Sequence, residues 1–169
     1  IVGTSGSGKT TLMKLLQQFY VPNSGEILVG KASLTNISPK HWRNHIGSVM
    51  QEGYIFNDTI ANNIAIGVDI IDKERLRYAA DVANINSYIQ TLPLGFNTKI
   101  GMEGVGMSTG QKQRLLIARA VYKNPEMLFF DEATSALDSI TEEEITETIR
   151  DLSEKQEHIT ILIAHRLST

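Results

Sequence analysis

Eight residues near the beginning of the sequence, "GTSGSGKT" at positions 3–10, combine glycines, hydroxyl residues and a lysine. Gly3, Gly8, Lys9 and Thr10 match the spacing G-x-x-x-x-G-K-[ST]. Glycines let successive backbone N–H groups turn toward one phosphate, and the helix that follows adds its positive N-terminal end. The pattern therefore predicts a nucleotide phosphate loop, with Lys9 on the β- and γ-phosphates and the Thr10 hydroxyl on Mg²⁺. The residues predicted to bind the nucleotide here are Gly3, Thr4, Ser5, Gly6, Ser7, Gly8, Lys9, Thr10 and Thr11.

Two neighbouring carboxylates end the apolar run "MLFFDE" at 127–132. Asp131 falls at the carboxyl end of an expected buried strand, where α/β sheets bind their ligands, and is predicted to hold Mg²⁺. Glu132 follows it, and a second carboxylate beside a γ-phosphate can accept a proton from an attacking water. Acids at strand ends are also common as plain solvated turn residues. The functional interpretation therefore depends on the phosphate loop being present as well.

The elements that must position these residues can be placed from the spacing of apolar residues. Strands are expected where short apolar runs occur, at 26–30, 46–51, 126–132 and 158–165. Helices are expected where apolar residues recur at helical spacing, at 8–20, 58–67, 72–84, 85–92, 109–123 and 139–155. Strands at both ends with a helical stretch between them predict an α/β fold with a mainly parallel sheet and an inserted helical subdomain.

Composition narrows the possible functions of the 169-residue chain, which is 41% hydrophobic and long enough for one domain with a sizeable core. No apolar run approaches the roughly 18 to 20 residues that span a bilayer, so any connection to a membrane is expected outside this chain. The absence of cysteine excludes disulfides and cysteine–zinc sites. The net charge of −3, without a basic cluster, makes nucleic acid a poor candidate partner.

A third motif gives the chain a family resemblance. "MSTGQ" at 107–111, followed by "KQRLLIARA", is similar to the Leu-Ser-Gly-Gly-Gln signature and helix of the nucleotide-binding domain of ATP-binding-cassette (ABC) transporters. Ser108, Gly110 and Gln111 match the signature, whereas Met107 and Thr109 depart from it. Exchanging leucine for methionine conserves volume. A β-branched residue in place of the first glycine can crowd a phosphate or restrict the loop, so slowed hydrolysis is one expectation.

Three further segments resemble the family's motifs in the family's order. The resemblance implies that Gln51 in "MQEGYIF" contacts Mg²⁺ and the catalytic water, and that "SALD" at 135–138 crosses to a partner subunit. It also implies that His165 in "AHRLST" contacts the γ-phosphate. Taken singly, Gln51 also fits a polar strand end, Asp138 a helix cap, and His165 a strand-ending histidine with ordinary hydrogen bonds.

The family resemblance implies a mechanism in which two chains sandwich two ATP molecules head to tail. Ser108, Gly110 and Gln111 of one chain then bind the nucleotide held by the other, and ATP and Mg²⁺ are the expected cofactors. The implied catalytic residues are Lys9, Gln51, Glu132 and His165, and the implied metal ligands are Thr10, Gln51 and Asp131. The expected partners are a second nucleotide-binding domain and a transmembrane domain, on the cytoplasmic face of the plasma membrane.

The stretch "QEGYIFNDTIANNIAIG" at 51–67 is most similar to exporter-type members, through Gln51, Glu52, Phe56, Thr59, Ile60, Asn63 and Ile64. Within exporters the chain looks most like peptidase-containing transporters that secrete peptides or bacteriocins. Met102 and Glu103 replace the Glu and Arg that exporters often carry before the signature. Tyr54, Ile55 and Phe56 are candidates either for the groove that receives a coupling helix or for core packing of the helical subdomain.

The predicted organisation is a core of residues 1–51 and 123–169 with a helical subdomain at about 52–122. Because the sequence starts two residues before the phosphate loop and ends four after His165, we expect a fragment of a longer polypeptide, truncated at both ends. Such a fragment is expected to bind ATP weakly and hydrolyse it poorly. Two alternatives stay open: a degenerate ATP-gated dimerisation module of a heterodimer, and a soluble ABC ATPase not tied to transport.

Overall fold

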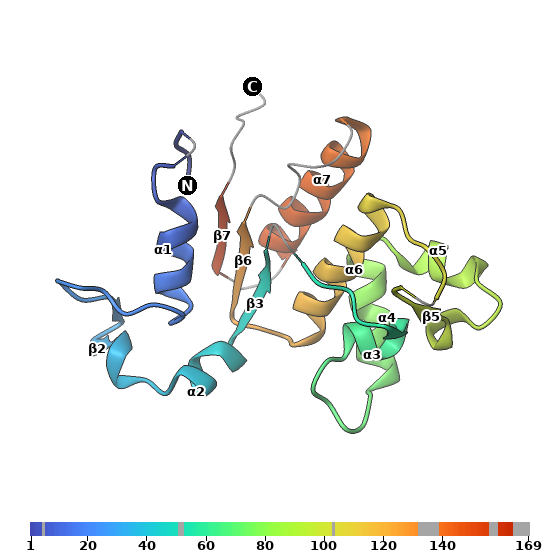
Figure 1. Ribbon diagram of the computed structural model, residues 1–169, viewed down its shortest axis with the longest axis horizontal. Helices are drawn as coiled ribbons and strands as arrows, with labels where there is room; N and C mark the ends of the chain where they lie inside the picture. Colours follow the sequence, from blue (N-terminus) through green and yellow to red (C-terminus); the bar gives the residue numbers. More distant parts are fainter. Residues whose placement is uncertain (5, 51–52, 103, 132–138, 156–158, 164–169) are drawn as a thin grey trace.

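A three-stranded parallel sheet forms the centre of the computed structural model, which describes residues 1–4, 6–50, 53–102, 104–131, 139–155 and 159–163. The strands lie in the order β3 (Ile46–Val49), β6 (Met127–Asp131) and β7 (Ile159–Ile163) (Figure 1). The register pairs Val49 with Phe130, and Asp131 with Ile163. The predicted α/β class with a parallel sheet is confirmed, and β6 is its central strand.

Helices cover both faces of this sheet (Figure 1). α1 (Lys9–Leu16) and α2 (Pro39–Asn44) pack on one face, while α6 (Thr109–Tyr122) and α7 (Ser139–Lys155) pack on the other. Side chains of β6 alternate between the two layers, so that Phe129 packs with Met13 of α1, and Leu128 and Phe130 pack with the α6 and α7 side. Burial on both faces explains why the strand reads as a continuous apolar run.

The helix after the phosphate loop ends earlier than its apolar spacing predicts, at Leu16 instead of residue 20. Gln18 takes a left-handed φ of 56°, and the Phe19 N–H donates to Lys14 O (2.8 Å), which closes the helix end. Trp42 Nε1 donates to Leu16 O (2.7 Å) from α2. The helix end is therefore fixed by contacts from a later part of the chain, which local periodicity does not report.

A small peripheral unit connects α1 to α2. β1 (Leu28–Val29) and β2 (Ala32–Ser33) form an antiparallel hairpin with Gly30 at φ 62° in its turn, and η1 (Leu34–Asn36) follows. The strand predicted at 26–30 is therefore shorter and lies outside the central sheet. Pro39 begins α2, as expected for a residue that has no N–H to donate.

The helical region lies beyond α6, on the side away from the sheet (Figure 1). Its elements are β4 (Asp58–Thr59), α3 (Ile60–Ile64), α4 (Lys73–Val82), α5 (Asn86–Thr91), η2 (Gly95–Asn97) and β5 (Lys99–Ile100). The helix predicted at 58–67 is shorter because β4 pairs with β5 and Thr59 then caps α3, accepting a hydrogen bond from Asn62 N–H.

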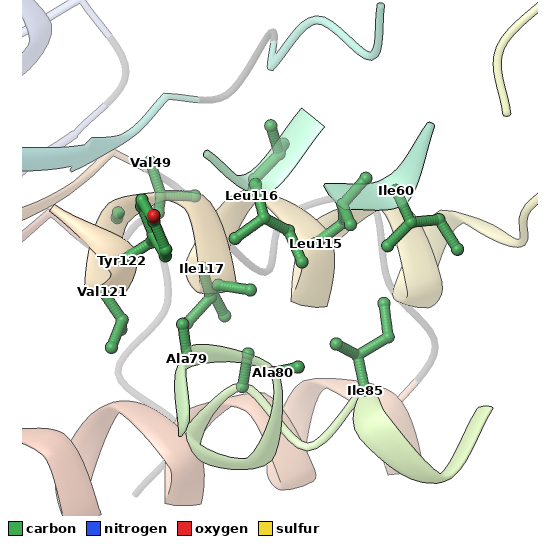
Figure 2. Packing of buried hydrophobic residues seen from close by; sticks show 14 of the residues in the cluster. Val49, Ile60, Ala79, Ala80, Ile85, Leu115, Leu116, Ile117, Val121 and Tyr122 are labelled. Carbon is green, nitrogen blue, oxygen red and sulfur yellow. The ribbon is translucent and has the colours of Figure 1, made fainter. Parts of the chain in front are cut away.

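One continuous apolar cluster joins this region to the sheet. Figure 2 shows Leu115, Leu116 and Ile117 of α6 lying between Val49 and Ile60 on one side and residues of α4 on the other. Ile145 and Ile149 of α7 belong to the same cluster. The division into a core and a subdomain at 51/52 and 122/123 stays a prediction. None of the helices formed by the described residues has the length and apolar composition to cross a bilayer.

Candidate nucleotide site

The loop in front of α1 has the backbone shape that its glycines permit. Gly6 and Gly8 have positive φ values of 77° and 86°, which side chains with a Cβ rarely adopt. Gly8 is the N-cap of α1, and within the described part of the chain no side chain caps this helix start and no acidic residue occupies its first turn. Open N–H groups at a helix start favour an anion. The loop is therefore suited to a phosphate.

Gly3 lies close to the Ser7 side chain within the loop. A Cβ at this position would lie 2.8 Å from Ser7 Oγ, inside normal contact distance. Ser7 N–H donates to Thr4 O (3.2 Å), which forms the turn between them. The first glycine of the motif thus permits close packing inside the loop, whereas Gly6 and Gly8 supply its left-handed turns.

Lys9 is buried, with 7% of its surface exposed, and its side chain turns back over the loop. Its Nζ donates to Gly3 O (2.8 Å) and Thr4 O (2.9 Å) and lies 3.4 Å from Ser7 Oγ. Holding an ammonium group at this place puts a full positive charge inside the ring of loop atoms. That is the charge a bound polyphosphate requires.

Thr10 and Asp131 meet although 121 residues separate them in the sequence. The Thr10 hydroxyl lies 3.4 Å from Asp131 Oδ1, and Asp131 is 2% exposed at the end of β6. Both groups offer hard oxygen atoms, which Mg²⁺ prefers. Two ligands on neighbouring positions of one Mg²⁺ would be about 2.9 Å apart, since Mg–O distances are about 2.0 to 2.1 Å. The spacing of this pair fits such an ion after a small adjustment.

The sheet explains why these residues meet. Met13 of α1 packs against Phe129 of β6, which sets the start of the helix beside the carboxyl end of the strand. The Ile1 nitrogen donates to Leu162 O (2.6 Å), so the residues before the loop run beside β7. The loop therefore sits at the carboxyl edge of the sheet, as ligand sites of parallel sheets do.

The signature residues form the start of α6. Ser108 is its N-cap and makes a capping box: its Oγ accepts from Gln111 N–H (3.2 Å), and Gln111 Oε1 accepts from Ser108 N–H (2.9 Å). Thr109, the first residue of the helix, is exposed and is not among the residues with a positive φ. Threonine thus fits the local backbone here.

α6 and α1 lie on opposite faces of the sheet (Figure 1). The structure therefore brings Lys9, Thr10 and Asp131 together, and places Ser108, Gly110 and Gln111 in a different layer. Other predicted site residues lie outside the described part of the chain, namely Ser5, Gln51, Glu132, the segment 135–138 and His165.

A hollow that the sequence did not predict lies near the end of β6 that is away from Asp131. It has a volume of about 480 Å³ and is lined by Asn36, Ile37, Ser38, His41, Trp42, His45 and Glu126. His45 Nδ1 lies 3.0 Å from Glu126 Oε1. Among the residues that the structure describes, no three histidine or acidic side chains gather closely enough to hold a metal ion. The hollow thus offers no metal centre.

Sequence reasoning also missed a polar network around Asn63 and Arg119. Asn63 is fully buried although it lies inside a segment predicted as an ordinary helix. The available signal was an asparagine at an apolar-spaced position between Ile60 and Ile64. A buried amide of this kind needs partners for all its polar atoms.

Comparison with known proteins gives the family. The profile of the family described as ABC transporter matches residues 1–135. The chain is 46% identical over 168 residues to ABC transporter B family member 13 of Arabidopsis thaliana, covering 99% of this chain and 13% of that protein. It is 46% identical over 169 residues to the leukotoxin translocation ATP-binding protein LktB of Mannheimia haemolytica, covering 100% of this chain and 24% of that protein.

A solved structure of a bacterial Atm1-family ABC exporter with ATP bound is also similar, with a TM-score of 0.87 and 44% identity. The match covers 99% of this chain and 29% of that one. This chain belongs to the ABC transporter family, as its motifs predicted. It spans between 13% and 24% of the length of these two curated relatives.

Proposed function

We propose that this chain is the ATP-binding and ATP-hydrolysing part of an ABC exporter. The observation that carries the proposal is the meeting of Thr10 with Asp131 in front of a left-handed glycine loop that holds Lys9. The relatives support it, since one is named an ATP-binding translocation protein and another was solved as an exporter with ATP bound.

In this proposal each residue of the site has one task. Lys9 and the open N–H groups of α1 bind the phosphates, and Thr10, Asp131 and Gln51 hold Mg²⁺. The ion, when bound, neutralises charge that develops on the phosphates. Glu132 accepts the proton of the attacking water, and His165 contacts the γ-phosphate. Lys9 and Asp131 are buried, so water screens the charges of these two side chains less than it would at the surface.

A second copy completes the site in this proposal. The sheet lies between α1, which follows the phosphate loop, and α6, which begins with the signature. In this proposal the signature residues therefore do not serve the nucleotide of their own chain. These residues are Ser108, Gly110 and Gln111. In the capping box the Ser108 oxygen accepts from Gln111 N–H, and its hydroxyl proton stays free to donate elsewhere. A head-to-tail pair of chains would bring that proton and the start of α6 to the partner's nucleotide.

The remaining partner is a transmembrane domain, which would place this chain at the cytoplasmic face of the membrane. Tyr54 and Phe56 support a docking role, because they are 65% and 45% exposed and stack edge to face with ring centroids 5.0 Å apart. We propose a peptide or protein as the exported substrate, by analogy with the relative named for leukotoxin translocation. A peptidase domain in the same protein stays a prediction, and nucleic acid is not a proposed partner.

Thr109 favours a second candidate function, a slow site that gates dimerisation in a heterodimer. Its exposed side chain at the start of α6 would face the partner's phosphate in the head-to-tail pair. Under this alternative Thr109→Gly raises the rate of hydrolysis about ten-fold or more, which corresponds to about 1.4 kcal/mol. Under the first proposal the rate changes little.

The proposed function is tested by ATP hydrolysis of the full-length protein with Asp131→Asn. Removing one oxygen charge from the Mg²⁺ site is expected to lower kcat by about 100-fold or more. Glu126→Gln is the matched control, because Glu126 precedes the same strand at its other end and is exposed. Wild-type protein without hydrolysis, or Asp131→Asn with normal hydrolysis, would contradict the proposal.

A further inference from the structure

The segment from Gly53 to Asp58, which follows Gln51, has little regular structure but is firmly bonded. Asn63 of α3 bonds both backbone groups of Phe56 in this segment: its Oδ1 accepts from Phe56 N–H (2.8 Å), and its Nδ2 donates to Phe56 O (3.0 Å) and, just beyond the segment, to Thr59 O (3.0 Å). One fully buried amide thus gives Phe56 the backbone hydrogen bonds that a neighbouring strand would otherwise supply.

Arg119 of α6 binds the same segment from the other side. Its Nε donates to Asn63 O (2.8 Å), Nη1 donates to Tyr54 O (2.9 Å), and Nη2 donates to Asn63 Oδ1 (3.2 Å). The guanidinium also lies 5.5 Å from the centre of the Phe56 ring. Each of the three guanidinium nitrogens has its own acceptor, a spread of donors that a lysine ammonium, with all its donors on one atom, does not reproduce.

α6 touches the segment at a second point, one turn earlier. A Cβ on Gly53 would lie 2.0 Å from Leu116 Cδ1, so the backbone at Gly53 rests directly on that leucine. Leu116 and Arg119 are three residues apart and so lie on one face of the helix. The segment therefore follows α6 closely, and only glycine allows this approach at position 53.

Arg119 and Asn63 depend on each other for their hydrogen bonds because both are removed from water. Burial lowers the pKa of Arg119 to about 10, which shows that its charge has lost much of its contact with water. A desolvated guanidinium depends on its acceptors, and a buried asparagine depends on its donors and acceptors. Breaking one partner leaves the other unsatisfied, so the two side chains act as a unit.

We propose that Arg119 and Asn63 form a latch that positions the segment Gly53–Asp58 relative to α6. The proposal rests on the proposed function, in which the start of α6 binds the partner's nucleotide and Gln51 binds Mg²⁺. Ser108 and Arg119 lie on one rigid helix, about 16 Å apart along its axis. Movement of the signature end of α6 is thereby transmitted through the latch to the exposed Tyr54 and Phe56. Arg119 and Asn63 are positioning residues, and neither touches the reacting atoms.

The latch is tested with a nitroxide on Asn57→Cys in a full-length protein whose cysteines outside this chain are replaced by serine, because Asn57 is exposed within the segment and this chain itself has no cysteine. Arg119→Lys and Asn63→Ala are each expected to raise the mobility of the label and to remove its response to Mg-ATP. The double variant is expected to be no worse than either single one, since both break the same unit. A label unchanged by Arg119→Lys would overturn the latch.

Two controls separate positioning from general stability. Ile117→Val weakens the packing of α6 on the side that faces Ala79 and Ala80 of α4 (Figure 2) by about 1 kcal/mol, and is expected to leave the label as in wild type. Arg77→Lys changes an exposed arginine of α4 that pairs with Asp81, and is expected to have no effect. If Ile117→Val mobilises the label as much as Arg119→Lys does, Arg119 acts only through stability and the latch is wrong.

Hydrolysis kinetics distinguish failure of the latch from failure of the proposed function. Arg119→Lys is expected to lower kcat about ten-fold with the KM for ATP within about two-fold, because the phosphate loop is untouched. Wild-type hydrolysis with an unaffected Arg119→Lys overturns the latch alone. A wild-type protein without hydrolysis overturns the proposed function, and the mobility of the label then still decides whether the latch exists.

Discussion

The two helix starts predicted to meet ATP are built in opposite ways. α1 begins at Gly8, with a left-handed φ of 86° and no capping side chain in the described part of the chain. α6 begins at Ser108, where a capping box satisfies the helix start locally. The first start therefore leaves its N–H groups open to a bound anion, whereas in the second the capping box satisfies the N–H groups of Ser108 and Gln111 without a ligand.

From this difference we expect the two helix starts to have different roles in the proposed site, the start of α1 in binding phosphate and the start of α6 in binding a partner chain. An open helix start offers N–H groups that can bind a phosphate and that water satisfies when no anion is present. A closed start keeps its shape in the absence of nucleotide and can present the same surface to a partner in every state of the cycle. We expect nucleotide to stabilise the region around α1 and to leave the start of α6 almost unchanged until a second chain binds.

The largest effect is expected from Lys9→Ala. Removing the buried ammonium should weaken Mg-ATP binding by about 100-fold, or about 2 to 3 kcal/mol, the range for a hydrogen bond to a charged group. Calorimetric titration measures this. Lys14→Ala on the same helix is the control, because Lys14 lies over the Tyr20 ring, away from the loop. If wild type and Lys9→Ala bind Mg-ATP with equal affinity, the loop at the start of α1 is not the phosphate site.

Gly8→Ala should have the next largest effect. A Cβ at a left-handed position costs about 1 to 2 kcal/mol, and at Gly8 it acts on the helix that carries Lys9 and Thr10. Urea unfolding without nucleotide measures the loss of stability. Gly106→Ala is a suitable control, because Gly106 has no positive φ and a Cβ there would meet open space. Similar losses in both variants would mean that φ at Gly8 does not matter.

Ser108→Ala should lower the free energy of unfolding by about 1 kcal/mol, because it removes one half of the capping box. The same change should leave the affinity of a single chain for Mg-ATP unaltered, since Ser108 lies on the opposite side of the sheet from the loop. Unfolding and titration on the same preparation test both statements. If Ser108→Ala weakens the binding of Mg-ATP to a single chain, Ser108 contacts the nucleotide of its own chain, and the proposal that the two helix starts serve different nucleotides is wrong.

The smallest effect is expected from Asp58→Asn, on the loss of folding stability at low pH. Its Oδ1 accepts from Thr59 N–H (2.7 Å) and Asn62 Nδ2 (2.9 Å), and these bonds hold its pKa below the ordinary 3.8. A lowered carboxyl pKa contributes stability above the unfolded value, and this contribution is lost as the pH falls through the folded value. Asp58→Asn should therefore lose less stability than wild type between about pH 5 and pH 2. If wild type and Asp58→Asn lose the same stability as the pH falls, groups other than Asp58 cause the loss.

The sequence predicted those features that depend on local pattern. The apolar run before Asp131 indicated a strand buried on both faces, and the helix predicted at 139–155 has the bounds of α7. The glycine spacing indicated a phosphate loop, and the loop shows the left-handed turns it requires. The meeting of Thr10 with Asp131 followed from the rule that parallel sheets bind ligands at their carboxyl edge.

Features fixed by distant contacts could not be predicted in this way. The spacing of Leu12, Leu15, Leu16 and Phe19 continues past the end of α1, which Trp42 helps to fix through Leu16 O. The shortening of the helix at 58–67 depends on the pairing of β4 with β5, about 40 residues later in the chain. Asn63 and Arg119 are 56 residues apart, and no local pattern indicates that they meet.

The central claim is that the phosphate loop of one chain and the signature of another enclose one ATP. The most direct test is the mass of the chain carrying Glu132→Gln, measured by light scattering with and without Mg-ATP, because this change should retain ATP by removing the proposed base. We predict that the mass doubles when Mg-ATP is added. A chain that binds nucleotide but keeps its monomer mass would contradict the shared site. Because this chain on its own is expected to bind ATP weakly, absence of nucleotide contradicts the phosphate site only if the full-length protein carrying Glu132→Gln also fails to bind Mg-ATP.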